Sequence, residues 1–165
     1  MIRKLCTLAA MFTALGTIGM GANSAYAAGI QVPFRGSYSG MAVTDFSSGT
    51  VDFSGTGIST QLGLSANEGH LQVTGPDSSC AGGLANVRNE TLTAANGDLL
   101  MLTSHDVACP IGPLVFHGTG HWVVTGGTGR FSGATGQGTT DGTGDFMQGV
   151  FTLQLTGTIS APNGG

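Results

Sequence analysis

Side chains that could carry out acid–base chemistry are few in this sequence, and they are scattered along it. A carboxylate, tyrosine or arginine becomes useful for such chemistry when burial or a charged neighbour changes its pKa. The available groups are Tyr38, Glu68, Glu90, Asp98, Asp106 and Arg130. Arg130 is our catalytic candidate because it lies in a glycine-rich segment, residues 126–136, and is one of three arginines after residue 27. The alternative role for Arg130 is structural, in an ion pair or as a donor that caps a turn.

The histidines do not form a metal-ligand pattern. His117 and His121 are four residues apart, and in an extended strand this spacing separates them by about 13 Å. His70 and His105 lie in other segments. The segment Asp141-Gly142-Thr143-Gly144-Asp145 alternates acids with glycines as calcium loops do, but it occurs once, so we interpret it as a hairpin turn. We expect no metal site.

Two further kinds of site are excluded by the residues themselves. Thr125-Gly126-Gly127-Thr128-Gly129 has the spacing of a nucleotide-binding loop, but Ser132 stands where the third glycine belongs and no helix pattern follows. The Gly-x-Ser-x-Gly elbow of serine hydrolases does not occur. The sequence therefore predicts no cofactor.

Residues 1–27 have the features of a secretory signal peptide. Arg3 and Lys4 precede an apolar stretch, and Ala25-Tyr26-Ala27 forms a small-x-small cleavage site. A transmembrane anchor is the alternative, but the glycines within the apolar stretch argue against it. We therefore expect a secreted protein, extracellular or periplasmic, without a membrane anchor, and a single domain over residues 28–165.

The residues after the signal peptide restrict redox state and partners. Cys80 and Cys109 are the only cysteines there, and an oxidising compartment favours a disulfide between them over two separate thiols. Nine acids stand against three arginines and no lysine in this part of the chain. Such a negative excess repels phosphate groups, so we expect neither nucleic acid nor an anionic membrane as a partner.

The rest of the pattern is that of short β-strands. Residues 34–43 and 150–159 alternate between apolar and polar side chains, and residues 51–60 form a further strand. Residues 61–74 predict one strand or two around Asn67-Glu68-Gly69, with core candidates at Leu62, Leu64, Leu71 and Val73. Asn96-Gly97 between two β-prone runs is the strongest signal of a two-residue hairpin turn.

Later segments complete the strand pattern. Pro110 and Pro113 bracket an expected loop, and residues 114–124 return as a strand. Gly126, Gly127 and Gly129 then predict a reversal, with residues 130–135 as the second strand of that hairpin. About eight antiparallel strands with regular turns predict an all-β barrel or sandwich, which the pattern alone does not separate.

A resemblance to a known family separates the two. Residues 126–136 resemble the glycine-rich hairpin of allene oxide cyclase and dirigent barrels, and resemble still more closely secreted bacterial proteins with an allene-oxide-cyclase-like barrel. Leu62-Gly63, residues 94–98 and residues 157–160 resemble that secreted family in the same order. The resemblance implies a single eight-stranded antiparallel barrel of calycin-like type. The chain departs from the family around its two cysteines, which we expect to staple loops at one mouth of the barrel.

Three functions follow as hypotheses. The first is a secreted barrel that binds a small apolar molecule or serves as a scaffold that self-associates as a homo-oligomer. The resemblance implies the second, an enzyme that steers cyclisation or coupling of a small molecule in the barrel cavity. A small outer-membrane barrel is a minor third, since the aromatic girdles that it needs are missing.

The state of the barrel interior distinguishes these hypotheses. A filled core would favour a scaffold, whereas an apolar pocket of about 300 Å³ or more with buried ionisable groups would favour ligand binding or catalysis. We expect such a pocket to be lined by Phe34, Tyr38, Phe116, Trp122 and Phe151. Its polar group would be Arg130 or a buried acid.

Overall fold

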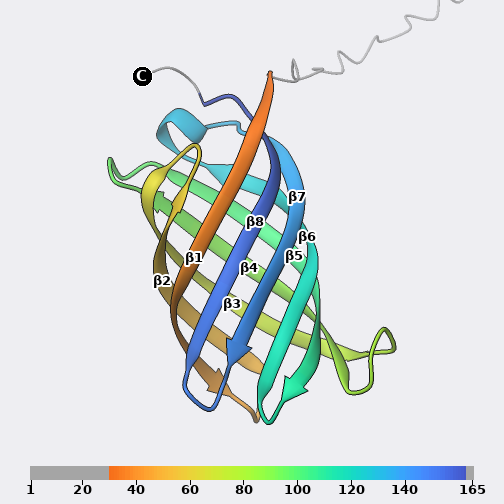
Figure 1. The fold of residues 1–165 in the computed structure, drawn as a ribbon. Coiled ribbons are helices and arrows are strands. Elements are labelled where there is room, and N and C mark those ends of the chain that lie inside the picture. Colours follow the sequence, from red (N-terminus) through yellow and green to blue (C-terminus); the bar gives the residue numbers. More distant parts are fainter. Residues whose placement is uncertain (1–29, 163–165) are drawn as a thin grey trace, which may run out of the picture.

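The chain forms a closed β-barrel. The computed structural model describes residues 30–162, so the predicted signal peptide lies outside the described residues. The elements are β1 (Gln31–Asp45), β2 (Thr50–Ser59), β3 (Gly63–Asp77), β4 (Gly83–Ala94), β5 (Leu99–Gly112), β6 (Val115–Gly127), the short 3₁₀ helix η1 (Gly129–Phe131), β7 (Gly136–Asp145) and β8 (Val150–Ser160). Each strand pairs antiparallel with the next, and β8 pairs with β1 (Figure 1). The prediction of an eight-stranded antiparallel barrel is confirmed.

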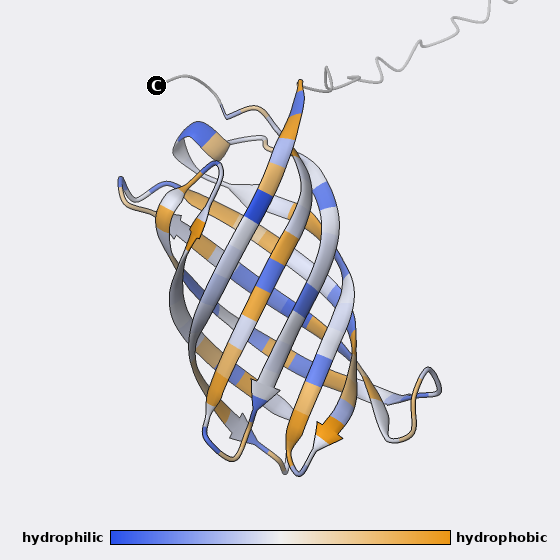
Figure 2. Cartoon of the chain, in the orientation of Figure 1, coloured by the Kyte–Doolittle hydropathy of each residue, from blue (hydrophilic) through white to orange (hydrophobic). Residues whose placement is uncertain are grey.

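Alternation along each strand separates the interior from the outer wall. In β1 the side chains of Phe34, Tyr38 and Ala42 are buried, whereas Arg35 and Ser37 are exposed. Figure 2 shows the same change between apolar and polar residues along the other strands. Apolar side chains thus fill much of the interior together with several buried polar ones, and the outer wall carries polar side chains as well as exposed apolar ones such as Met41, Val43 and Ile58.

The two ends of the barrel are built differently. At the end where β1 begins, β8 ends and η1 lies, here called the closed end, the Phe34 and Trp122 rings meet edge to face at 5.5 Å. Phe131 of η1 is fully buried in the same cluster. At the opposite or open end, formed by the β1–β2, β3–β4, β5–β6 and β7–β8 turns, a smaller cluster holds Ala42, Val51 and Phe53.

The glycine-rich segment closes one end of the barrel and is not a hairpin strand. Residues 130–135 were expected to form a strand, but β7 begins only at Gly136. Gly129 has a φ of +54° and Gly133 one of +73°, and the Phe131 N–H donates to the Thr128 carbonyl at 3.0 Å. The strand prediction is wrong because burying the Phe131 ring over the core requires a turn at this point. Of the three glycines expected to make the reversal, Gly126, Gly127 and Gly129, it is Gly129 that has a positive φ.

The hairpin at Asn96-Gly97 is confirmed, with a different turn from the one predicted. Gly97 has a φ of +85°, while Asn96 is not among the described residues with positive φ. The Gly97 N–H donates to the Ala94 carbonyl and the Ala94 N–H donates to the Asp98 carbonyl, both at 2.9 Å. This pattern is a type I turn followed by a glycine bulge, so the loop has three residues and needs only one left-handed position.

Three further predictions need correction, and one open alternative is decided. Of the one strand or two expected in residues 61–74, the structure has one, because β3 continues through Asn67, whose side chain points inward and binds Glu90. Leu64 was a core candidate, but it is exposed. Pro110 lies within β5 and not in a loop. The alternating acids and glycines of residues 141–145 belong to strand β7, and the turn follows them.

The predicted disulfide is confirmed. Cys80 in the β3–β4 turn is bonded to Cys109 near the end of β5. The bond therefore ties two adjacent hairpins together at the open end. No helix among residues 30–162 is long and apolar enough to cross a membrane.

Candidate functional site

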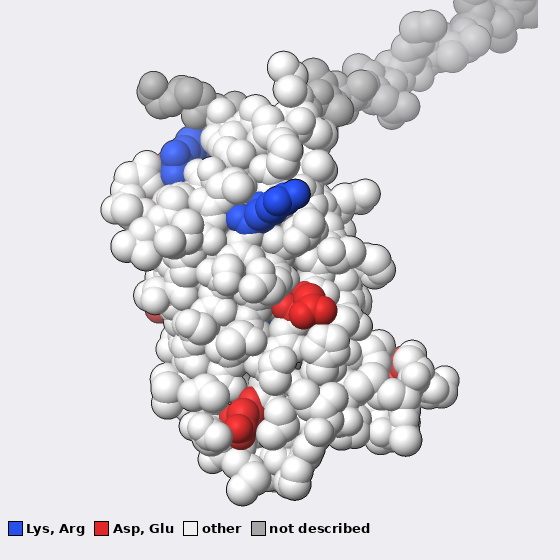
Figure 3. All heavy atoms as spheres, viewed as in Figure 1, with Lys and Arg blue, Asp and Glu red and all other residues white. Residues whose placement is uncertain are grey.

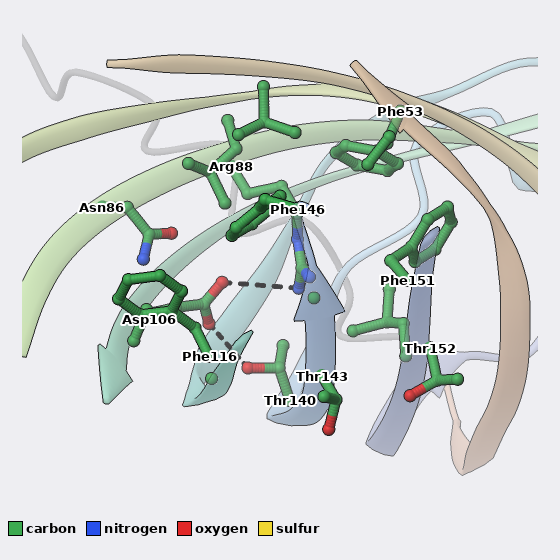
Figure 4. Close-up of a pocket in the computed structure, with 18 residues that line it drawn as sticks. Phe53, Asn86, Arg88, Asp106, Phe116, Thr140, Thr143, Phe146, Phe151 and Thr152 are labelled. Atoms are coloured by element: carbon green, nitrogen blue, oxygen red, sulfur yellow. Dashed lines mark hydrogen bonds and ion pairs between the residues drawn. The ribbon is translucent and has the colours of Figure 1, made fainter. Parts of the chain in front are cut away.

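A pocket of about 90 Å³ lies inside the open end of the barrel. Four phenylalanines, Phe53, Phe116, Phe146 and Phe151, form much of its wall (Figure 4). The polar part of the lining includes Asn86, Arg88, Asp106 and Thr140. The volume is smaller than the roughly 300 Å³ expected of a site for a drug-sized molecule. Two broader hollows lie over β3–β4 and β6–β7, but their linings include exposed residues of the outer wall such as His70 and His121.

Missing side chains in β6 create the empty space. Gly118 lines the pocket, and a Cβ built on it would meet no atom within 4 Å. Gly120 is the next inward position, and a Cβ there would collide with the Asp106 side chain. Glycine at position 118 therefore leaves room for a guest, and glycine at position 120 leaves room for the carboxylate.

Strand alternation carries the charged groups into the interior. Along β4 the inward positions are Asn86, Arg88 and Glu90, followed toward the closed end by Leu92 and Ala94. Because Leu92 and Ala94 belong to the apolar core, the side chains two and four residues before them must point the same way. Arg88 is 9% exposed, Glu90 3% and Asp106, on neighbouring β5, 7%.

The three charged groups form one connected cluster. Nη2 of Arg88 lies 3.6 Å from Oε1 of Glu90 and 3.5 Å from Oδ2 of Asp106, and it donates a hydrogen bond to Ser104 Oγ at 3.1 Å. Thr140 Oγ1 donates to Asp106 Oδ1 at 2.6 Å. Figure 4 shows Asp106 held between Arg88 and Thr140 at the pocket lining.

Glu90, the third charged group of the cluster, has a raised pKa. Asn67 Nδ2 donates to its Oε2 at 3.0 Å, but its Oε1 accepts no hydrogen bond from the described residues. Burial raises the pKa of Glu90, and the positive charge of Arg88 only partly opposes that effect. The site thus holds one carboxyl with a raised pKa, Glu90, beside an ion pair between Arg88 and Asp106.

The predicted lining residues divide between the two ends. Phe116 and Phe151 line the pocket. Phe34, Tyr38 and Trp122 are instead packed in the closed-end core. The Tyr38 hydroxyl shares a hydrogen bond with Ser65 Oγ at 3.0 Å, and burial raises its pKa. These three side chains close the space beyond the pocket.

Arg130 lies at the closed end, away from the pocket. Its Nε is 3.6 Å from Asp98 Oδ2, and its guanidinium lies 5.0 Å from the centre of the Phe131 ring. Its backbone N–H donates to the same Asp98 oxygen at 3.3 Å. These contacts tie η1 to the β4–β5 turn.

The histidines point to the outer wall. His70 Nδ1 lies 2.7 Å from Asp52 Oδ1, and His117 Nε2 lies 3.2 Å from Asp141 Oδ2. Across residues 30–162 no group of three or more His, Cys, Asp or Glu side chains is placed to hold a metal ion.

Sequence reasoning included Glu90 and Asp106 among its acid–base candidates but missed Arg88 and Phe146. Arg88 could have been found from strand alternation, which places it on the face of Leu92. Phe146 had no such signal, because it lies in the turn after β7, in an Asp-Phe-x-x-Gly pattern that occurs at residues 45–49 and 145–149 and leaves Phe46 exposed in its first copy.

The two copies of this pattern fold into similar turns at the open end. Asp45 Oδ1 accepts the N–H of Ser47 at 2.8 Å, and Asp145 Oδ1 accepts the N–H of Met147 at 3.0 Å. The glycines that end the pattern have φ values of +69° and +65°. Hydrogen bonds from Ser47 and Ser48 lower the pKa of Asp45 to about 2. Phe46 of the first turn is exposed, whereas Phe146 of the second turns into the pocket.

Comparisons with known proteins give a fold likeness. No protein-family model matches the sequence, and no curated protein matches it. Among solved structures the chain is similar to a pterocarpan synthase dirigent protein, with a TM-score of 0.49 and 15% sequence identity over 92% of this chain and 98% of that one. We base no conclusion on a likeness at this level.

Proposed function

We propose that the barrel binds a small, largely apolar molecule in the pocket at its open end. The observation that carries this proposal is the difference between the two ends. The closed end is filled by Phe34, Trp122 and Phe131, whereas the open end leaves about 90 Å³ empty between phenylalanine rings and a buried ion pair. A barrel that served only as a scaffold would gain stability by filling both ends.

The lining limits the kind of molecule that fits. Aromatic walls favour an apolar body, and the polar groups Asn86 and Asp106 favour one polar group on it. The volume suits a body of fewer than about ten heavy atoms, for which a Kd on the order of 1 mM is typical.

We propose that the protein acts after export. The Cys80–Cys109 disulfide supports this localisation because such bonds persist in oxidising compartments. The intact mass of the exported protein should correspond to a chain that starts at Ala28. A mass that retains residues 1–27 would contradict export by signal cleavage.

Filling the pocket is the sharpest test of ligand binding. Gly118→Leu places a side chain in empty space on the inner wall, while Thr119→Leu places the same side chain on the exposed outer wall of the same strand. We expect benzyl alcohol to bind the native protein and the Thr119 variant with similar affinity in an NMR titration, and to bind the Gly118 variant at least about tenfold more weakly. Equal binding to all three proteins would refute the proposal.

A second candidate function is acid–base catalysis on the bound molecule. The observation that favours it is the pairing of a carboxyl with a raised pKa, Glu90, and an ion-paired one, Asp106, in contact with Arg88. Opposed environments of this kind divide acid and base roles between two groups. Turnover of an unsaturated lipid, polyketide or phenolic radical that is lost in folded Asp106→Asn would support this candidate. Turnover that persists in this variant would contradict it.

A further inference from the structure

The rings around the pocket suit a positively charged guest. Phe53 and Phe151 meet at a centroid distance of 5.3 Å, and Phe116 and Phe146 meet at 5.8 Å. All four side chains line the pocket. Aromatic faces carry negative partial charge and attract cations, organic ammonium groups in particular.

The charged cluster has no positive charge left for an anion. Nη2 of Arg88 is within 3.6 Å of a carboxylate oxygen of both Glu90 and Asp106. If both acids are ionised the cluster carries a net charge of about −1, and if Glu90 is protonated the net charge is about zero. In neither state does the pocket offer an unbalanced cation.

The pocket lining also contains a buried hydrogen-bond acceptor without a partner, Asn86 Oδ1. Asn86 lines the pocket and is 4% exposed. Its Oδ1 is buried and accepts no hydrogen bond within the described part of the chain. A buried carbonyl oxygen without a partner is costly, and an N–H or O–H donor on a guest would satisfy it.

Charge is also separated along the barrel. Arg35 lies toward the closed end, where its backbone N–H donates to Thr60 in the β2–β3 turn. Arg130 lies at the same end beside Asp98, whose charge offsets its own. Asp45, Asp77 and Asp145 end the strands that lead into turns at the open end. On the face in Figure 3 the basic atoms lie above the acidic ones. The resulting field attracts cations to the mouth of the pocket and repels anions.

We propose that the molecule bound in this pocket is a small organic cation, an ammonium group with an apolar body. The inference rests on the proposed function and names its ligand class. The ammonium group lies near Asp106 and Asn86, and the body of the molecule lies among the phenylalanine rings. Carboxylate and phosphate ligands are disfavoured for the same reasons.

Choline and its uncharged carbon analogue, 3,3-dimethylbutan-1-ol, test this inference because they differ in charge and hardly in shape. We expect choline to bind at least about tenfold more tightly in NMR titrations at pH 7.5. Equal affinities, or tighter binding of the analogue, would overturn the inference and leave the proposed function standing. Binding of benzyl alcohol without binding of choline would also overturn the inference and leave the proposed function standing. If none of the three probes binds, both the inference and the proposed function are overturned.

Two variants test whether the cation binds in this pocket. We expect Asp106→Asn to abolish the preference for choline, and Asp141→Asn, which changes an exposed acid on β7, to keep it. If Asp106→Asn does not fold, Phe116→Leu tests whether the cation binds in this pocket, since it removes a ring while keeping an apolar side chain. This variant should lower choline affinity toward that of the analogue and leave the analogue's binding unchanged. A preference for choline that survives every folded variant at Asp106 and Phe116 would overturn the assignment.

Discussion

Replacing Arg88 by methionine should destabilise the barrel more than any other single change of charge. Methionine keeps the apolar stem but removes the guanidinium that separates Glu90 from Asp106, and both acids are more than nine-tenths buried. Breaking a buried ion pair from one side typically costs about 3–5 kcal/mol. That is a large share of the roughly 5–15 kcal/mol that stabilises a typical domain.

Urea unfolding followed by Trp122 fluorescence measures this loss, because Trp122 is fully buried in the core. With an m-value of about 2 kcal/mol/M, the midpoint should fall by roughly 1.5–2.5 M at pH 7. Arg35→Met is the matched control, since Arg35 is exposed on the outer wall and should change stability by less than about 0.5 kcal/mol.

The pH dependence of the destabilisation is a second test of the ion-pair cluster. Arg88 opposes the burial that raises the pKa of Glu90, so without Arg88 this pKa moves further above its unfolded value. The destabilisation is therefore largest at neutral pH and shrinks as pH falls and Glu90 is protonated. Equal midpoints for the Arg88 and Arg35 variants at pH 7, or a difference between them that does not change down to pH 4.5, would refute the account of the cluster.

Three further predictions concern stability. Replacing Cys80 and Cys109 by serine should lower the unfolding free energy by up to about 3.6 kcal/mol for a separation of 29 residues, less if the denatured state keeps structure, and a calorimetric Tm equal to that of the native protein would contradict this. Gly97→Val should cost about 1 kcal/mol or more from backbone strain alone, because a Cβ there would meet no atom within 4 Å, and an unchanged urea midpoint would show the turn to be misassigned. Because burial raises the pKa of Glu90, ionising this carboxyl opposes folding as pH rises above its unfolded value. Glu90→Gln should therefore gain stability relative to the native protein between pH 4 and pH 7, whereas parallel stability curves for the two proteins would contradict the burial argument.

The sequence predicted the fold well where local chemistry decides it. Alternation in β1 and β8 and the Asn96-Gly97 turn follow from side-chain period and turn preference, and each is local. The segment around Phe131 was predicted wrongly because its turn depends on a core that distant strands provide. Glycine-rich sequence permits both a strand and a turn, and burial of one ring chooses between them.

The candidate site was harder to predict because it depends on which end of the barrel is filled. Phe34, Trp122, Phe116 and Phe151 are all inward-facing aromatics, and alternation alone cannot tell core packing from pocket lining. The distinction follows from Gly118, which leaves empty space on the inner wall, and from the register that pairs it with Gly142 in the pocket lining. Such a pairing between strands becomes visible only when the barrel closes.

Binding at the open end can be observed in a crystal of the native protein soaked with benzyl alcohol. We expect electron density for the ring at the open end, between Phe53, Phe116 and Phe151 and beside Gly118, with the polar group toward Asp106. Phenylalanine side chains that collapse to fill this space, or density for the probe only on the outer wall, would contradict it.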